Sequence, residues 1–265
     1  MYGAILGDII GSPYEFDQGT KTKEFPLFSQ YSTFTDDTVM TIAVADAFMD
    51  LQFEGHGAKC KLITSLKKYG RMFPNAGYGA RFARWLFLGG KEPYNSWGNG
   101  SAMRVSSVAW LYEDVYAVRS AARCSAEITH NHPEGIKGAE ATASAIYLAR
   151  TGSTKEEIKT YIEDNFGYDL SQSCDEIRPN YHHVESCQET VPEAITAFLE
   201  GESFEDVIRT AVSLGGDCDT LTCIAGAIAE GFYGVPEELK WECKSRLPVE
   251  LKAVLERFDE VTKRR

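Results

Sequence analysis

The chain has 265 residues, of which 43% are hydrophobic and 25% charged, enough for a core in one large domain or two small ones. Its formal net charge of −12 argues against general affinity for nucleic acids or anionic membranes, because their phosphates would be repelled. Seven cysteines without a Cys-x-x-Cys pair indicate reduced thiols. The N-terminus does not resemble a signal peptide, and no apolar stretch could span a bilayer, so we expect a cytoplasmic protein without a membrane partner.

The first predicted element is a glycine-rich buried helix over residues 2–12. Gly3, Gly7 and Gly11 recur every four residues, which leaves one face of this helix almost without side chains. We expect that face to pack tightly against another helix. An irregular loop is predicted to follow over residues 17–34.

Helical periodicity recurs along the rest of the chain, and no alternating strand pattern is present. A helix is predicted from Asp36 to near Phe53, and loops are predicted over 92–101 and 165–188. Further helical segments are predicted at 58–70, 77–88, 102–111, 114–127, 134–150, 154–164, 191–200, 203–213, 219–232 and 236–262, the last broken near Pro248. The predicted fold class is all-α, a single compact multi-helix domain over residues 1–265.

Two acidic motifs each open an apolar helical pattern, Thr35-Asp36-Asp37-Thr38 and Gly215-Gly216-Asp217-Cys218-Asp219-Thr220. Aspartate and threonine at a helix start can cap its free N–H groups and suit the helix dipole. Four carboxylates gathered at one buried place would instead repel one another unless a cation neutralises them. Such hard oxygen ligands select Mg²⁺, Mn²⁺ or Ca²⁺. The pattern leaves two alternatives, one shared metal site or two sets of helix caps.

Three further features are weaker candidates for a site. Glu15 lies in a loop, where it is either solvated or a general acid or base beside the metals. Gly98-Asn99-Gly100-Ser101 precedes a helix and forms either an anion-binding loop or a tight turn. His130 and His132 lack companion zinc ligands, so we expect a helix cap or a substrate contact.

Five motifs, in this order along the chain, resemble those of the ADP-ribosylglycohydrolase family, which includes dinitrogenase-reductase-activating glycohydrolase. They are Gly7-Asp8-Ile9-Ile10-Gly11, Thr35-Asp36-Asp37-Thr38, Gly98-Asn99-Gly100-Ser101-Ala102-Met103-Arg104, Thr129-His130 and Gly215-Gly216-Asp217-Cys218-Asp219-Thr220. The resemblance favours the metal site over the caps. It implies an all-α fold with a binuclear Mg²⁺ or Mn²⁺ centre at the base of a cleft.

The resemblance also implies roles for single residues, by matching positions. The implied metal ligands are Thr35, Asp36, Asp37, Asp217, Asp219 and Thr220. The implied substrate-binding residues are Gly98, Asn99, Gly100, Ser101 and His130. The implied catalytic residues are Glu15, Asp36 and Asp219. Cys218 stands where many relatives have Thr or another small residue, and we expect its thiol to face the packed helix.

The implied reaction is hydrolysis of the bond between the ribose anomeric carbon and a modified group, with release of ADP-ribose. The substrate would be ADP-ribose linked to a protein side chain, a nucleic-acid base or a small molecule, and two divalent cations would be the cofactors. The alternatives are a non-catalytic ADP-ribose-binding or structural relative, and a metal hydrolase of another nucleotide-like substrate. The motifs do not identify the linkage, and we expect the loops at 17–34 and 165–188 to select it.

Overall fold

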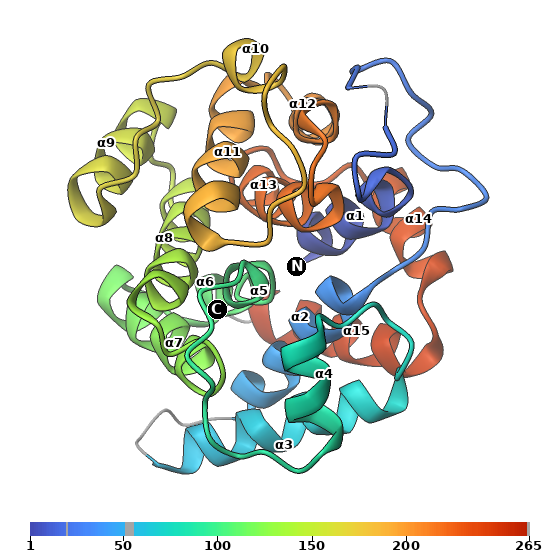
Figure 1. The fold of residues 1–265 in the computed structure, drawn as a ribbon, viewed down its shortest axis with the longest axis vertical. Coiled ribbons are helices and arrows are strands. Elements are labelled where there is room, and N and C mark those ends of the chain that lie inside the picture. The colour runs from blue at the N-terminus through green and yellow to red at the C-terminus, as the bar shows by residue number, and fades with distance from the viewer. Residues whose placement is uncertain (20, 51–55, 264–265) are drawn as a thin grey trace.

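The computed structural model describes residues 1–19, 21–50 and 56–263, and across these ranges helices form and no strand does, apart from an isolated bridge between Gly98 and Ser186. The helices lie around α1 (Tyr2–Gly11) and α13 (Cys218–Tyr233), which run side by side in the middle of Figure 1. Together they enclose one buried apolar cluster. The predicted all-α class is therefore confirmed.

The remaining helices follow the predicted order, except that the short helix α10 (Cys174–Ile177) lies within the predicted loop at 165–188. They are α2 (Asp36–Met49), α3 (His56–Met72), α4 (Ala80–Phe87), α5 (Gly100–Met103), α6 (Val108–Leu111), α7 (Val115–Glu127), α8 (Pro133–Arg150), α9 (Lys155–Phe166), α10 (Cys174–Ile177), α11 (Cys187–Glu200), α12 (Phe204–Leu214), α14 (Glu237–Arg246) and α15 (Val249–Lys263), with a 3₁₀ turn at Ser12–Tyr14 after α1. None of the helices in the described residues is long and apolar enough to cross a membrane.

The glycine face of α1 packs against α13, as the spacing predicts. A methyl group added at Gly3 or Gly7 would lie 2.7 Å from the carbonyl carbon of Gly226 or 2.6 Å from the backbone nitrogen of Cys223. Any side chain there would push the two helices apart, because the obstructing atoms belong to the backbone. This close approach fixes the start of α13 beside the end of α1.

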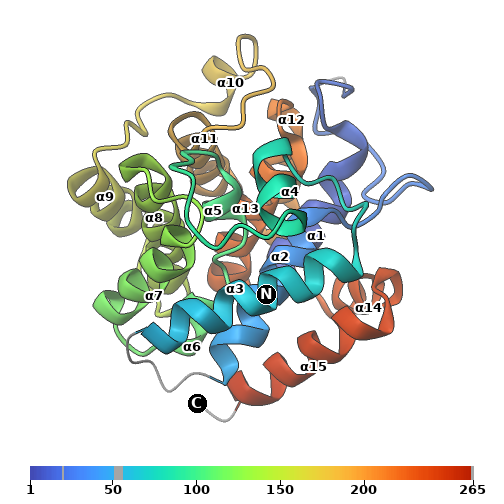
Figure 2. The same ribbon diagram turned by 60° about the horizontal axis from the view of Figure 1, so that its bottom comes forward.

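The centre of the fold is covered on several sides. Helices α8, α11 and α12 pack on α13, while α3 and α15 pack on α2 in the lower half of Figure 2. Every residue of α13 from Cys218 to Ala229 is buried, which agrees with a sequence that is apolar on all faces of the helix. The two acidic motifs therefore open helices that belong to the core.

Some predicted boundaries differ from the observed ones. Helix α2 ends at Met49, and its predicted end near Phe53 lies outside the described residues. The predicted run 102–111 divides into α5 and α6, because the chain turns between Arg104 and Ser107. Helix α11 begins at Cys187, before the predicted start at 191, and it accommodates Pro192 within the helix. The predicted break near Pro248 separates α14 from α15.

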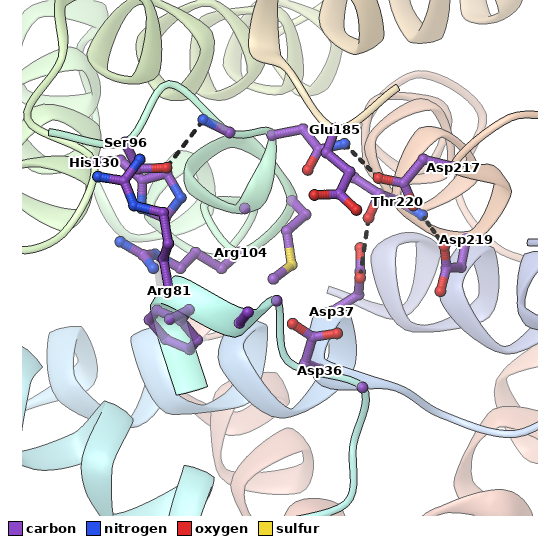
Figure 3. Close-up of a pocket in the computed structure, with 18 of the residues that line it drawn as sticks. Asp36, Asp37, Arg81, Ser96, Arg104, His130, Glu185, Asp217, Asp219 and Thr220 are labelled. Atoms are coloured by element: carbon purple, nitrogen blue, oxygen red, sulfur yellow. Dashed lines mark hydrogen bonds between the residues drawn. The ribbon is translucent and has the colours of Figure 1, made fainter. Parts of the chain in front are cut away.

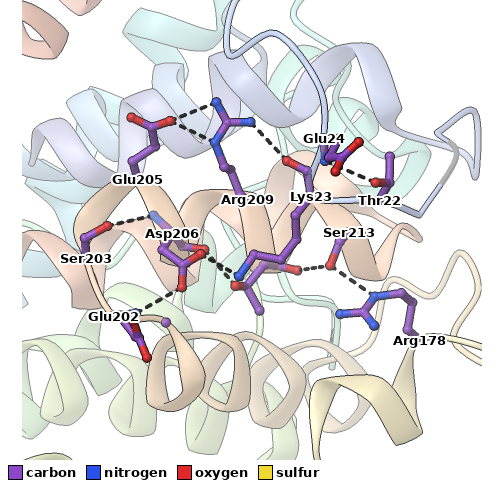
Figure 4. A network of polar contacts seen from close by, with 12 residues as sticks. Thr22, Lys23, Glu24, Arg178, Glu202, Ser203, Glu205, Asp206, Arg209 and Ser213 are labelled. Carbon is purple, nitrogen blue, oxygen red and sulfur yellow. Dashed lines mark hydrogen bonds and ion pairs between the residues drawn. The ribbon is translucent and has the colours of Figure 1, made fainter.

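The predicted loop at 17–34 is irregular over its described residues, 17–19 and 21–34, and charged side chains tie it to α12 (Figure 4). Lys23 forms an ion pair of 2.5 Å with Asp206. Arg209 donates hydrogen bonds to the backbone carbonyls of Lys23 and Phe25, at 3.0 and 2.7 Å. Because these contacts hold the backbone, the loop has a defined path next to the starts of α2 and α13.

Candidate active site

A cavity of about 330 Å³ lies between the start of α2, the start of α13, α4 and the loop before α5 (Figure 3). Its lining carries carboxylates on one side and arginines on the other. The acidic side chains are Glu15, Asp36, Asp37, Glu185, Asp217 and Asp219. The opposite side presents Arg81, Arg104, Ser96 and His130. Tyr94 also lines the cavity and contacts Arg81 and His130. One side of the cavity is therefore acidic and the other is basic.

The fold brings the two acidic motifs together. The Thr220 hydroxyl donates a hydrogen bond of 3.2 Å to Asp37 Oδ2, which joins the start of α13 to the start of α2. One carboxylate oxygen from each of Asp8, Asp37 and Asp219 lies within 4.8 Å of the others. The same holds for Glu15, Asp217 and Asp219. Two overlapping groups of carboxylates that share Asp219 therefore stand where a cation could bind.

Helix capping uses few of these acids. Thr35 caps α2 by accepting a hydrogen bond from the N–H of Asp37. Asp8 caps the same helix from α1, since its carboxylate accepts from the N–H groups of Thr35 and Thr38 at 2.9 and 3.0 Å. Asp217 stands at the N-cap of α13, yet within the described chain its side chain accepts no capping hydrogen bond. The caps alternative therefore leaves most of the carboxylates unexplained.

Burial is the main electrostatic influence on the acidic side. It raises the pKa of Asp8 and Asp217 to about 6 and raises the pKa of Asp36, Asp37 and Asp219 further above the ordinary aspartate range. Repulsion from Asp219 adds to the effect at Asp36 and Asp37. Asp37 Oδ1 is buried and has no hydrogen-bond partner among the described residues. A hard divalent cation would fit this oxygen donor set and satisfy that atom.

Glu15 and Glu185 extend the acidic side toward solvent. Burial and the charge of Asp219 raise the pKa of Glu15 to about 7. Glu185 comes from the irregular stretch before α11, and its side chain is 72% exposed. Phe16, also in the lining, packs against His183 with ring centroids 4.8 Å apart and ring planes tilted by 37°. Phe16 holds a positive φ of 57°, a strained backbone conformation of the kind found at functional sites.

The two arginines on the other side donate to carbonyl and hydroxyl oxygens, and neither forms an ion pair with an acid in the described part of the chain. Arg104 is 1% exposed and donates hydrogen bonds to Ser125 O at 2.7 Å and Thr129 Oγ1 at 2.8 Å. Its Nε has no described partner, and burial lowers its pKa to about 10. Arg81 is exposed, donates to the carbonyl of Tyr94 and stands 5.1 Å from that ring. An anion would supply the missing counter-charge.

The loop before α5 is held in place by its neighbours. The N–H of Asn99 donates to Glu185 O at 2.8 Å, and the N–H of Cys187 donates to Trp97 O at 3.0 Å. Ser101 lies beneath the loop and donates to Gly135 O at 2.6 Å. Gly98, Asn99 and Gly100 line the cavity, whereas the predicted substrate residue Ser101 and the predicted ligand Thr35 are not part of its lining.

The histidines occupy different settings. His130 lines the cavity and is buried, which lowers its pKa and keeps it neutral at physiological pH. A methyl group added at Gly100 would lie 3.3 Å from His130 Nε2, so glycine lets the loop approach this ring. His132 caps α8 by accepting from the N–H of Glu134. The thiol of Cys218 is directed away from the cavity, 3.8 Å from Val212 O, as expected.

Sequence patterns alone did not identify several lining residues. Arg81 and Tyr94 belong to no motif, and only the fold brings them to the cavity. Glu185 lies within the stretch 165–188, which was expected to select the linkage. Arg104 lines the cavity and falls inside a motif that implies no role for it. The same holds for the motif of Asp8, whose carboxylate lies within 4.8 Å of Asp37 and Asp219 but outside the lining. Their signal was a charged residue within an otherwise apolar buried segment.

Comparisons with known proteins cover nearly the whole chain. The family model described as ADP-ribosylglycohydrolase matches residues 1–264. The ADP-ribosylhydrolase ARH3 of Homo sapiens is 28% identical, over 92% of this chain and 88% of the human protein. The ADP-ribosylarginine hydrolase Tri1 of Pseudomonas putida is 24% identical, over 89% of this chain and 70% of that protein. A solved structure titled ADP-ribosylglycohydrolase-related protein complex shares the fold, with a TM-score of 0.72, 23% identity and coverage of 98% and 95%.

Proposed function

This chain belongs to the ADP-ribosylglycohydrolase family and is a hydrolase, and from that membership we propose that it cleaves ADP-ribose from an ADP-ribosylated arginine side chain with the help of two divalent cations. The bond broken joins the ribose anomeric carbon to the modified group, and water supplies the hydroxyl of the released ADP-ribose. The predicted cytoplasmic location and the extent of one domain over residues 1–265 stay predictions.

The observation that carries this proposal is the opposite charge of the two sides of the cavity. A diphosphate is anionic, and the guanidinium groups of Arg81 and Arg104, which have no acidic partner among the described residues, are suited to bind it. The ribose would then lie toward Asp36, Asp37 and Asp219, where the carboxylates can stabilise positive charge at the anomeric carbon. A ligand with a diphosphate at one end and a reacting ribose at the other fits both sides at once.

The proposed cation ligands are the six residues of the two motifs. They are Thr35, Asp36, Asp37, Asp217, Asp219 and Thr220. Of these, Asp37, Asp217 and Asp219 belong to the two carboxylate groups, and Thr220 is hydrogen-bonded to Asp37. Bound there, Mg²⁺ or Mn²⁺ would orient the ribose hydroxyls and lower the pKa of a water molecule. Asp37 Oδ1, for which no partner is found in the described residues, supports a role of this kind. Asp8 already accepts hydrogen bonds from Thr35 and Thr38, so we assign it to holding the site together.

Glu15 is the proposed proton acceptor for the attacking water. Its carboxylate lies within 4.8 Å of oxygens of Asp217 and Asp219, at the edge of the proposed cation site. Gly98, Gly100 and neutral His130, the last on the arginine side, would contact the ligand, because all three line the cavity. The neutral imidazole can accept or donate a hydrogen bond without repelling the ligand.

The rim of the acidic side supports arginine as the linked residue. Glu185 is largely exposed there and contacts His183, which also packs against Phe16, a residue that is 58% exposed. A guanidinium group binds carboxylates through paired hydrogen bonds and stacks on aromatic rings, whereas a serine hydroxyl does neither. The Pseudomonas putida relative is named as an ADP-ribosylarginine hydrolase, which agrees with this preference.

The proposal is tested by measuring release of ADP-ribose from peptides modified on arginine or on serine and from a modified DNA base, with Mg²⁺, with Mn²⁺ and with chelator. We expect chelator-sensitive release from the arginine peptide. Release of ADP-ribose from the serine peptide alone would contradict the proposed arginine linkage but agree with the proposed hydrolysis. Binding of ADP-ribose without release from any substrate would support the alternative of a non-catalytic binding protein.

A further inference from the structure

The side-chain amide of Asn99 donates two hydrogen bonds to other residues of the protein. One amide hydrogen bond goes to Asp217 Oδ2 at 2.6 Å and the other to Thr190 Oγ1 at 3.1 Å. The three residues come from the loop before α5, the start of α13 and the first turns of α11. Their exposed fractions are 7%, 6% and 0%. Water therefore has little access to this chain of hydrogen bonds.

A carboxylate that binds a cation works best when its orientation is fixed before the cation arrives. A neutral amide donor does this without competing for the charge, whereas a lysine or arginine at the same place would form an ion pair with the acid. The amide can face Asp217 only with its NH₂ group, because its oxygen would repel the carboxylate. Thr190 accepts the second N–H and thereby keeps the amide in that orientation.

We propose that Asn99 and Thr190 are positioning residues that act through Asp217 on the cation site. The side chain of Asn99, expected from the family resemblance to bind substrate, serves here to orient a proposed metal ligand. The inference rests on the proposed function, because it requires Asp217 to bind a cation. It assigns to α11 a part in metal affinity that neither acidic motif reveals.

The same residues also join the cation site to the rim. The backbone N–H of Asn99 donates to Glu185 O, and the Thr190 hydroxyl is 3.5 Å from Val184 O. The backbone that carries Glu185 is therefore connected through Asn99 to Asp217. The direct hydrogen-bonded route from Thr190 to Asp217 runs through the side chain of Asn99, and Thr190 also interacts with Tyr181, which lies beside Gly216.

The test is calorimetric titration of Mn²⁺ into substrate-free protein. Asn99→Ala is expected to weaken Mn²⁺ binding by about 10- to 100-fold, the usual cost of removing a residue that orients a metal ligand. Thr190→Val should weaken it less, and Thr190→Ser should restore it. In the double variant the loss should be close to that of Asn99→Ala alone, because the hydrogen bond from Asn99 is the direct link between Thr190 and Asp217. Thr196→Val makes the same chemical change on α11 away from the cavity and serves as the control.

Equal Mn²⁺ affinity of the wild type and all variants would overturn this inference and leave the proposed function standing. If the two losses of Mn²⁺ affinity add up in the double variant, Thr190 does not act on Asp217 through Asn99. A rise in the KM for substrate with unchanged Mn²⁺ affinity would make Asn99 a substrate contact, as the family resemblance implied. A wild type that binds no Mn²⁺ would instead overturn the proposed function, and the inference with it. If Asn99→Ala does not fold, the Thr190 pair of variants still decides between these results.

Discussion

Asp8 shows how one side chain can free several others for chemistry. Its two oxygens accept hydrogen bonds from the N–H groups and hydroxyls of Thr35 and Thr38, so the start of α2 is capped from a neighbouring helix. Asp36 and Asp37 are then not needed as caps of their own helix. Repulsion between these buried carboxylates destabilises the fold, and such an arrangement is typical of a functional site where a bound cation neutralises the charge.

Arg81 is the residue on which binding of the diphosphate is expected to depend most. Arg81→Gln removes the positive charge and the guanidinium group that is proposed to contact the diphosphate. We therefore expect ADP-ribose to bind at least about tenfold more weakly. Arg81→Lys should recover part of the affinity, since the charge remains but the planar group is lost. Calorimetry with ADP-ribose measures both variants. Arg84→Gln, on the same helix and outside the cavity lining, should bind like the wild type; an equal loss there would contradict a specific role for Arg81.

Glu193 on α11 predicts a pH dependence of stability away from the cavity. Burial raises its pKa to about 7, and within the described residues its Oε2 has no partner. A raised pKa means that this residue stabilises the fold below about pH 4.5 and that the benefit is lost as pH rises through 7. Glu193→Gln should match the wild type near pH 4.5 and exceed it at pH 8 by roughly 1–2 kcal/mol. Urea unfolding at both pH values measures this.

The control for that comparison is Glu256→Gln, on the exposed face of α15. It should change stability little at either pH. A Glu193→Gln variant that is equally stable relative to the wild type at pH 4.5 and pH 8 would show that the buried carboxyl does not titrate differently in the folded and unfolded chains.

At the scale of elements, the α1–α13 contact sets the geometry of the acidic side. Glycines let the two backbones touch, and this places Asp8 beside Asp219 and against the start of α2. Helix α2 then completes the site from the other direction. The site is thus built from helix ends whose positions are fixed by backbone packing.

Gly7→Ala should therefore be strongly destabilising although alanine favours helices. Its methyl group would meet the backbone of Thr222 and Cys223, which cannot move aside, and we expect a loss of about 3 kcal/mol or more in the free energy of unfolding. Gly57→Ala is the matched change, because a methyl group there would have no atom within 4 Å. It should be neutral or stabilise by up to about 1 kcal/mol. Similar losses for both variants in urea unfolding would contradict the packing explanation.

The helices and both acidic motifs could be predicted because their signals are local. Periodicity identified the apolar helices, and glycine spacing identified the close-packed face of α1. Arg81 and Glu185 could not be predicted, since each lies in an ordinary local context and reaches the cavity only through the arrangement of α4 and the stretch before α11. The role of Asp8 as a cap for another helix was missed for the same reason.

At the scale of the whole molecule, the buried carboxylates link metal binding to stability. Their raised pKa values mean that the metal-free fold loses the stability they contribute as pH rises from about 4 through 6 and above. Cations that bind only the folded state reverse this loss. At low pH, protons occupy the same oxygens and compete with the metal.

We therefore expect Mn²⁺ at about 100 times its Kd to raise the Tm by roughly 5–10 °C at pH 7.5, and by less at pH 5. Chelator should abolish the rise. Differential scanning fluorimetry measures these shifts, with Asp37→Asn as the variant expected to lose most of the response. A rise of the same size at both pH values, or an undiminished rise in Asp37→Asn, would contradict binding at the carboxylates.

The pairing of α1 with α13 also has a consequence for synthesis on the ribosome. Helix α1 carries Ile5, Leu6, Ile9 and Ile10, all fully buried in the finished fold, but its partner begins only at Cys218. At ordinary rates of translation, synthesis of the chain between α1 and α13 takes roughly 10–40 s, and during that time α1 has no α13 to pack against. During this interval its glycine-rich apolar surface is open to chaperones and to other nascent chains. Folding of the proposed active site is consequently a late event, completed only when most of the chain has left the ribosome.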